Sequence, residues 1–146
     1  RLETLPRVRS EPLMATLTPE QEAFLRDHRL GVLATGRKDG SPQASTIMYV
    51  YHDGEVIISV TEDRAKWVNA IRQPKVALVV LDGRKQLVLY GNARGVEADP
   101  DRLLFHKRIR EAMNRPVEDE AEYLDLLDKQ KRVILAISPT KVLMNE

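Results

Sequence analysis

Residues 43–61 read QASTIMYVYHDGEVIISVT, two apolar stretches joined by His52-Asp53-Gly54. An Asp-Gly pair supplies the positive-φ positions of a tight turn, and between two apolar runs it is a strong hairpin signal. The sequence therefore predicts a strand over Gln43–Tyr51, a turn, and a second strand over Glu55–Thr61.

Outward from this hairpin, short apolar runs alternate with turn residues and with stretches of helical period. Gly91 and Gly95 are expected to mark bends or bulges within one long strand. Short strands joined mostly by hairpins predict a mainly β fold with helices, a small antiparallel barrel in one domain. A parallel doubly wound sheet would need helices between most strands and a Gly-rich phosphate loop. The further strands are predicted over 30–35, 76–81, 86–97, 133–137 and, at an edge, 141–144, and the helices over 18–28, 64–72, 99–116 and 118–130.

The helices after residue 99 should bury apolar stripes. In the first of them Leu103, Leu104, Ile109 and Met113 are expected to face inward. In the second, the stripe is Tyr123, Leu124, Leu126 and Leu127.

Composition excludes several classes of function. The 146 residues hold 23 basic and 22 acidic side chains, so no overall field favours nucleic acid or a membrane surface. The absence of cysteine excludes disulfides and thiolate sites, and is compatible with the cytoplasmic location we expect. Residues 1–16 lack the apolar stretch of a signal peptide and are predicted to be an irregular N-terminal extension, with Met14 as a candidate natural start. The barrel domain is expected over residues 17–146.

Arg64 and Lys66 stand at a predicted strand-to-helix junction. A helix start offers free N–H groups and the positive end of the helix dipole, so added cations make a site for phosphate or carboxylate. Basic side chains there oppose the dipole and destabilise the helix, which calls for a functional reason. The alternative is a solvated helix start, in which Glu62 and Asp63 balance the two cations.

Other residues give weaker signals. Small side chains over residues 41–49 would let a planar ligand approach the backbone, although a barrel strand with one wet face explains them equally. His28, His52 and His106 lie in different predicted elements without metal-ligand spacing, so no metal site is predicted. Each is expected to be a surface or helix-end histidine, and Trp67 is expected in the core.

Three stretches together resemble the split β-barrel of the pyridoxamine 5'-phosphate oxidase-like flavin and deazaflavin proteins. They are residues 31–45, which include Asp39-Gly40-Ser41-Pro42-Gln43, then Arg64-Ala65-Lys66 ahead of Asn69 and Pro74, and Gln86 to Gly95. The resemblance covers residues 17–144. It implies a homodimer with the cofactor at the interface.

The resemblance also implies roles for individual residues. Arg64 and Lys66 would bind the cofactor phosphate. Gln86 would contact the flavin, within its own subunit or from the partner. The residues expected to line the ring and its polyol chain are Ser45, Thr46, Ile47 and Met48, and those expected to close the other side are Ser59, Val60 and Thr61.

Two departures from the flavin oxidases matter. Ser45 stands where those enzymes carry an arginine, and no substrate-phosphate motif follows Lys141. Both argue against oxidation of pyridoxamine phosphate. The compact chain is more similar to the branch that uses coenzyme F420, a deazaflavin with a phosphodiester and carboxylate tail, and FMN is the alternative cofactor.

The resulting hypothesis is an F420-dependent reductase that transfers a hydride from the reduced deazaflavin to a conjugated small-molecule acceptor. The protein would supply position and electrostatics. Tyr49, Tyr51 and His106 are candidate proton donors, with solvent as the alternative. An FMN-dependent oxidoreductase on the same barrel and a flavin- or F420-binding protein without turnover are the rival functions. Balanced charge and only two Phe, four Tyr and one Trp argue against a nucleic-acid-binding barrel.

Overall fold

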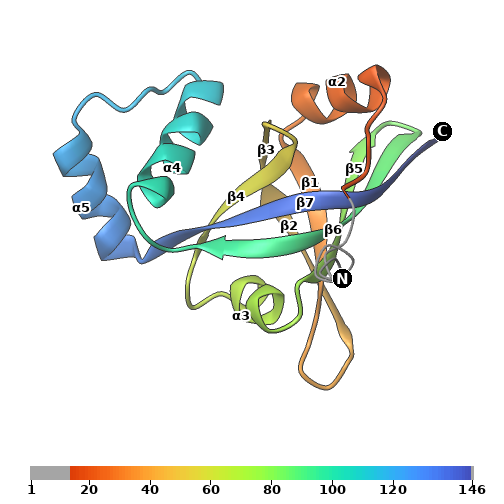
Figure 1. Ribbon diagram of the computed structural model, residues 1–146, viewed down its shortest axis with the longest axis horizontal. Helices are drawn as coiled ribbons and strands as arrows, with labels where there is room; N and C mark the ends of the chain where they lie inside the picture. The colour runs from red at the N-terminus through yellow and green to blue at the C-terminus, as the bar shows by residue number, and fades with distance from the viewer. Residues whose placement is uncertain (1–13, 146) are drawn as a thin grey trace, which may run out of the picture.

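The computed structural model describes residues 14–145, which form one antiparallel sheet with four helices around it (Figure 1). The strands are β1 (Leu30–Gly36), β2 (Pro42–Met48), β3 (Val50–His52), β4 (Glu55–Thr61), β5 (Lys75–Asp82), β6 (Lys85–Val96) and β7 (Arg132–Asn145). The helices are α2 (Pro19–Asp27), α3 (Ala65–Arg72), α4 (Asp101–Ala112) and α5 (Glu120–Gln130).

The strand order shows that the sheet curls. It runs β2-β1-β5-β6-β7-β4-β3, so the consecutive strands β2 and β3 lie at opposite ends of the sheet. Because a single residue, Tyr49, joins them, the two ends of the sheet must approach each other. The result is a barrel that remains open between β2 and β4, the antiparallel split barrel predicted from the sequence.

Local signals for turns and caps are confirmed. Gly54 and Gly83 sit in hairpin turns with φ of 79° and 61°, a conformation that favours glycine. At the start of α2, Thr18 Oγ1 accepts from the Gln21 N–H at 3.1 Å, while Gln21 Oε1 accepts from the Thr18 N–H at 2.9 Å. This capping box fixes where the helix begins. Of the predicted N-terminal extension, residues 1–13 lie outside the described part; residues 14–16 are irregular, and the Ala15 N–H donates to the Pro139 carbonyl at 2.8 Å.

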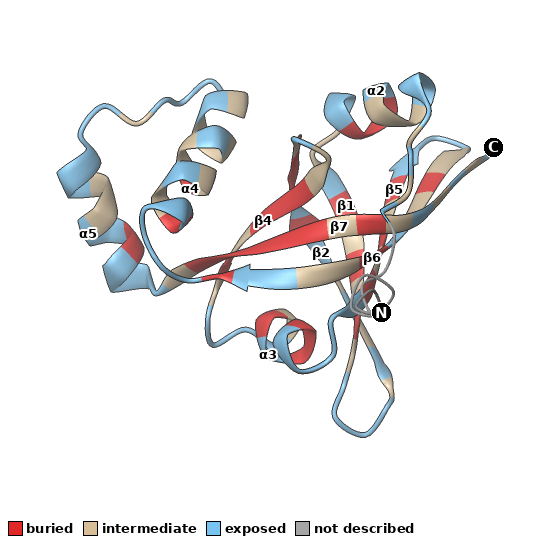
Figure 2. Cartoon of the chain, viewed as in Figure 1, coloured by how far each residue is buried: buried red, intermediate tan, exposed pale blue. Residues whose placement is uncertain are grey.

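The main core fills the inside of the curl (Figure 2). Strand residues alternate between this core and the outer face, as a pleated strand requires. Two helices add to it: α2 contributes Phe24 and Leu25, and α3 contributes Trp67 and Ala70. Trp67 is 7% exposed, so its predicted place in the core is confirmed. Full burial of one such aliphatic or aromatic side chain stabilises the fold by about 1.5–3 kcal/mol.

The strand predicted over residues 43–51 is in fact two strands. β2 ends at Met48 and β3 begins at Val50. Between them, the Tyr49 N–H donates to the Arg29 carbonyl at 2.8 Å, and its buried hydroxyl donates to the Leu25 carbonyl at 2.8 Å. These bonds hold the crossing from one end of the sheet to the other. The prediction was wrong because the apolar pattern continues through the crossing.

One strand, β7, replaces the two strands predicted near the C-terminus. It pairs with β4 through residues 132–137 and with β6 through residues 134–145. The register of β6 and β7 shifts between Tyr90 and Gly91: Tyr90 pairs with Lys141 and Gly91 with Pro139, so β7 carries an extra residue, Thr140. The predicted irregularity therefore lies beside Gly91, but the bulged strand is β7. Gly95 lies in regular pairing, and it is small because the Trp67 ring packs over it: a Cβ there would stand 2.6 Å from Trp67 Cη2.

The inward face of α4 matches the prediction only in part, because Ile109 packs against the sheet while two of the other predicted residues do not. Leu104 and Met113 are 45% and 36% exposed, whereas Arg102 and His106 are buried. Burial of these polar groups is tolerated because each has partners. Arg102 donates to Asp99 at 3.0 Å and to Asp128 of α5 at 2.7 Å. Helix α5 departs from prediction at Leu126, which is 44% exposed, while Leu127 is buried.

Helix α4 packs on the outer face of the sheet through a smaller apolar cluster. Ile109 and Phe105 of α4 pack against Ile57, Val96 and Ile134. Helices α4 and α5 together stand to one side of the barrel (Figure 1). None of the helices in residues 14–145 has the length and apolar character needed to cross a membrane.

Candidate functional site

A cavity of about 510 Å³ lies where the barrel stays open. Its walls include residues 46–50, which run from the end of β2 through Tyr49 to the start of β3, and residues 57–61 of β4. Within residues 14–145, no strand pairs with the second edge of β2, and β3 pairs with β4 only up to Ile57. The free backbone edges of two strands therefore border the cavity, and their N–H and C=O groups can hydrogen-bond the edge of a planar ring.

Four cations line this cavity. They are Arg29, Arg64, Lys66 and Arg132, and none of the lining residues is a carboxylate. Over the described range, none of these cations forms an ion pair with an acidic side chain. A concentration of unpaired positive charge in a hollow attracts anions. The pocket is suited to a phosphate, a phosphodiester or a carboxylate.

The start of α3 strengthens this positive field. Arg64 is the N-cap residue and makes no side-chain cap, and the first turn of α3 contains no acidic residue. The positive end of the helix dipole is therefore not offset from within the helix. Burial and the neighbouring Arg64 charge both lower the pKa of Lys66. An anion bound between the two side chains would relieve this repulsion.

The structure brings together most of the predicted cofactor site. Thr46, Ile47, Met48, Ser59, Val60, Thr61, Arg64 and Lys66 all line the cavity, and Ser45 and Gln86 do not. Ser45 pairs with Leu33 on the inner face of the barrel, and its Oγ is buried without a hydrogen-bond partner among the described residues. Gln86 lies on the outer face at the start of β6 and donates to Asn145 at 3.0 Å.

Two of the four cations were not predicted. Arg132 reaches the cavity because it lies opposite Thr61 in the β4–β7 ladder. Arg29 donates to the Ala112 carbonyl at 3.0 Å, which ties the end of α4 to the rim of the cavity. No local motif marks either residue, because the pairing of distant segments places them there.

None of the three candidate proton donors offers a proton to the cavity. The hydroxyl of Tyr49 donates to Leu25, and that of Tyr51 donates to Glu22 at 3.1 Å. Burial raises the pKa of both hydroxyls. His106 was expected at the surface or at a helix end, but it is 2% exposed in the middle of α4, and burial lowers its pKa to about 4.

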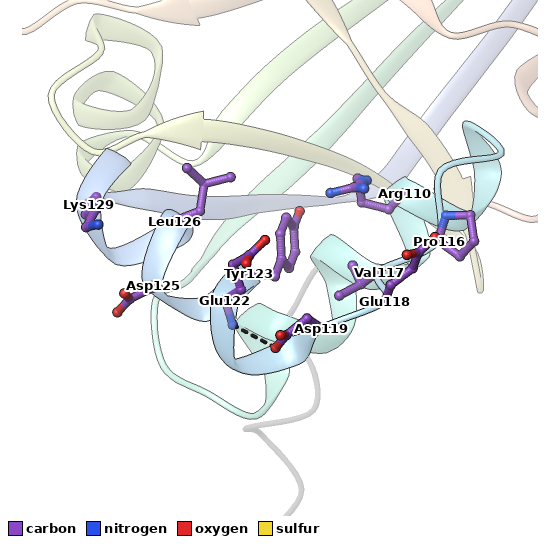
Figure 3. Close-up of a pocket in the computed structure, with 10 residues that line it drawn as sticks. All are labelled: Arg110, Pro116, Val117, Glu118, Asp119, Glu122, Tyr123, Asp125, Leu126 and Lys129. Carbon is purple, nitrogen blue, oxygen red and sulfur yellow. Dashed lines mark hydrogen bonds between the residues drawn. The ribbon is translucent and has the colours of Figure 1, made fainter.

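A second cavity, of about 470 Å³, lies between α4 and α5 (Figure 3). Four carboxylates line it with only two cations, Arg110 and Lys129. Arg110 stacks over the Tyr123 ring at 5.1 Å, and Asp119 caps α5 by accepting from the Glu122 N–H at 3.1 Å. This second cavity contains none of the predicted cofactor-site residues, and its carboxylates outnumber its cations, so we assign the candidate site to the first cavity.

Solved structures share this fold. The conserved hypothetical protein Rv2991 from Mycobacterium tuberculosis is 25% identical, with a TM-score of 0.76 over 90% of this chain and 85% of that one. An F420 reductase is 26% identical, with a TM-score of 0.65 over 84% of this chain and 94% of its own. The heme storage protein HutZ from Vibrio cholerae is 20% identical, with a TM-score of 0.66 over 88% and 94% of the two chains, and shares the fold alone.

The family comparison covers nearly all of the described chain. Residues 17–145 match the model of the family described as pyridoxamine 5'-phosphate oxidase. The F420 reductase places an oxidoreductase among the proteins of this fold. The chain belongs to the pyridoxamine 5'-phosphate oxidase family of split β-barrel proteins.

Proposed function

We propose that this protein is an F420-dependent reductase that binds the deazaflavin in the cavity between β2 and β4. The observation that carries the proposal is the set of four unpaired cations beside two free strand edges. A cofactor with an anionic tail and a planar ring needs both features. The structural likeness to an F420 reductase supports the deazaflavin over FMN.

The residues of the cavity fit such a cofactor. Arg64, Lys66 and Arg132 would hold the phosphodiester, because they lie at the Thr61 end of the cavity. The free edges of β2 and β4 would hydrogen-bond the ring. Met48 and Ile109 supply apolar walls that exclude water. When bound and reduced, the deazaflavin supplies a hydride to an electron-poor conjugated acceptor.

A second copy of the chain would complete the site. The outward side chains of β1, β5, β6 and the end of β7 form an apolar surface, which we call the open face; its exposed members include Leu30, Leu81, Tyr90 and Leu143. Met48 lies opposite Leu30, so the open face continues into the cavity. A monomer seldom exposes so continuous an apolar surface. In the proposed homodimer, Gln86, which also lies on the open face, would approach the partner's cavity.

Parallel titrations of cofactor-free protein test the proposal. Oxidised F420 and FMN are each added while the fluorescence of Trp67, the only tryptophan, is followed. Trp67 directly follows Lys66, so a ligand on that side chain should quench it. The double variant Arg64→Ala/Lys66→Ala should lose several kcal/mol of binding free energy, because each charge-assisted hydrogen bond contributes roughly 1.5–3 kcal/mol.

A matched control removes the same charge elsewhere. Arg37→Ala/Lys38→Ala changes two exposed cations in the turn between β1 and β2, outside the cavity, and should leave affinity unchanged. Unchanged affinity in the Arg64→Ala/Lys66→Ala variant, or binding of neither cofactor, would overturn the proposal. Preferential FMN binding would instead assign the FMN-dependent rival. Tight F420 binding without oxidation of the reduced cofactor by enones or quinones would assign a binding protein without turnover.

A further inference from the structure

The hydroxyl of Ser59 is held by a buried histidine from another element. Ser59 lies on the outer face of β4 and lines the cavity, while His106 lies behind it on α4 and does not. Ser59 Oγ and His106 Nε2 are 2.8 Å apart. The other ring nitrogen, Nδ1, lies 2.8 Å from the Arg102 carbonyl oxygen.

These two contacts determine which atom carries each proton. A carbonyl oxygen can only accept, so His106 Nδ1 carries a proton and donates it to Arg102. The low pKa of His106 keeps the ring neutral near pH 7, so Nε2 carries no proton. Nε2 therefore accepts from the hydroxyl of Ser59. Since its one proton is used in this way, Ser59 turns only lone pairs toward the cavity.

The hydroxyl proton of Thr61, two residues further along β4, is also used in a hydrogen bond within the protein. Its Oγ1 donates to Asp63 Oδ1 at 2.6 Å, outside the cavity. Ser59 and Thr61 lie on the same face of β4, because side chains alternate along a strand. The wall of the cavity nearest the cations thus presents two hydroxyl oxygens, both available only as acceptors. The cationic side chains beside them can only donate.

We infer that His106 is a positioning residue that makes Ser59 an obligate hydrogen-bond acceptor, and that the cavity selects a ligand with donor hydroxyls next to its anionic group. This inference rests on the proposed function, whose cofactor carries a polyol beside its phosphate or phosphodiester, and adds the role of His106 and the direction of the hydrogen bond at Ser59. A ligand with an ether or carbonyl oxygen at that place would meet the lone pairs of Ser59 and Thr61 and be rejected. The selectivity comes from His106, a residue of α4 that does not itself line the cavity.

The first measurement needs no cofactor. ¹⁵N NMR of the wild-type protein near pH 7 reports the tautomer of each histidine, and the assignment of His106 comes from the His106→Phe variant. We expect His106 with the proton on Nδ1, the minor tautomer of free imidazole. A proton on Nε2 would overturn the inference whatever the protein binds.

The second measurement is a double-mutant cycle with three probes that differ in the side chain of the flavin. FMN carries a polyol phosphate, riboflavin the polyol alone and lumiflavin neither. If the titrations show that only the deazaflavin binds, F420 takes the place of FMN and 8-hydroxy-5-deazariboflavin, which has the polyol alone, takes the place of riboflavin. Ser59→Ala should weaken FMN and riboflavin about threefold to tenfold, the range of one net hydrogen bond, and leave lumiflavin unchanged. His106→Phe should weaken the same two probes, and should have no further effect in the Ser59→Ala background.

Ser138→Ala is the control variant for these binding measurements. Ser138→Ala removes a hydroxyl from the same sheet face, where Ser138 donates to Glu55 at 3.3 Å, and should not change affinity. Equal losses for lumiflavin, or additive losses in the double variant, would overturn the inference. If neither flavin nor F420 binds while His106 shows the Nδ1 proton, the proposed function and the ligand class fail, and only the polarity at Ser59 stands.

Discussion

Arg132 lies directly opposite Thr61 in the β4–β7 ladder, and this pairing adds a third cation to the end of the cavity that holds Arg64 and Lys66. Arg132 Nε donates to Gln130 at 3.2 Å, and no acidic side chain in the described chain neutralises the guanidinium. The candidate anion site is thus assembled from two segments far apart in the sequence.

The Arg132→Gln variant should therefore weaken the binding of anionic cofactors. We expect a loss of about 1.5–3 kcal/mol for FMN or F420, and a much smaller one for riboflavin, which has no phosphate. Isothermal titration of the three ligands measures the difference. Lys38→Gln, in the exposed turn between β1 and β2, is the control. Equal losses for FMN and riboflavin would mean that Arg132 acts through the fold and not through the anion.

His106 should make stability depend on pH. Its pKa in the folded protein is about 4, below the ordinary value of 6.5, because of burial and the Arg102 and Arg132 charges, partly opposed by the Arg102 carbonyl and Asp99. The unfolded chain therefore takes up the proton first. Neutral His106 therefore contributes its full share of stability above pH 6.5. As pH drops from 6.5 toward 4, the free energy of unfolding should fall by up to about 3 kcal/mol.

Urea unfolding at a series of pH values from roughly 4.5 to 7.5, which covers most of the interval between the two pKa values and the plateau above it, measures this slope. The His106→Phe variant should be less stable at neutral pH but should lose most of the slope. If the variant keeps the wild-type slope over this range, other groups are responsible.

Gly95→Ala should destabilise the packing of α3. A Cβ at this position would stand 2.6 Å from Trp67 Cη2 and 2.7 Å from Ile71 Cδ1, so the helix must move. Overpacking of this kind costs about 1–3 kcal/mol. Thermal unfolding and the Trp67 emission spectrum report the change. Gly36→Ala is the matched control, because its Cβ would meet only Gln73 Cγ at 3.8 Å. Equal stability of the two variants would contradict this account.

Charges on the open face should dissociate the proposed dimer. Tyr90→Glu and Leu143→Glu each place a carboxylate among apolar side chains of β6 and β7 that are 44% and 43% exposed. Sedimentation velocity should then show the monomer mass, together with weaker cofactor binding. Leu126→Glu, at an equally exposed position on α5, should remain dimeric. A wild-type monomer with full affinity would rule out a shared site.

Part of the candidate site was open to prediction from the sequence. Arg64 and Lys66 stood out because a helix start favours anions through its own backbone, and this depends only on adjacent residues; the family resemblance then implied their role at a cofactor phosphate. Thr46 to Met48 and Ser59 to Thr61 were identified through the family resemblance, and the fold brings both segments to one cavity. The polarity at Ser59 was not predictable, because it depends on how α4 packs.

The sequence by itself determined the hairpins, the capping box of α2 and the antiparallel barrel, since turn chemistry and apolar period act over a few residues. Only the tertiary structure decided the crossing at Tyr49, the single long strand β7 and the burial of His106. Each of these depends on partners distant in the chain: Tyr49 on Leu25, β7 on β4 and β6, and His106 on Ser59. A buried polar side chain is stable only where a partner completes its hydrogen bonds. The local sequence pattern does not identify that partner when it lies far away in the chain.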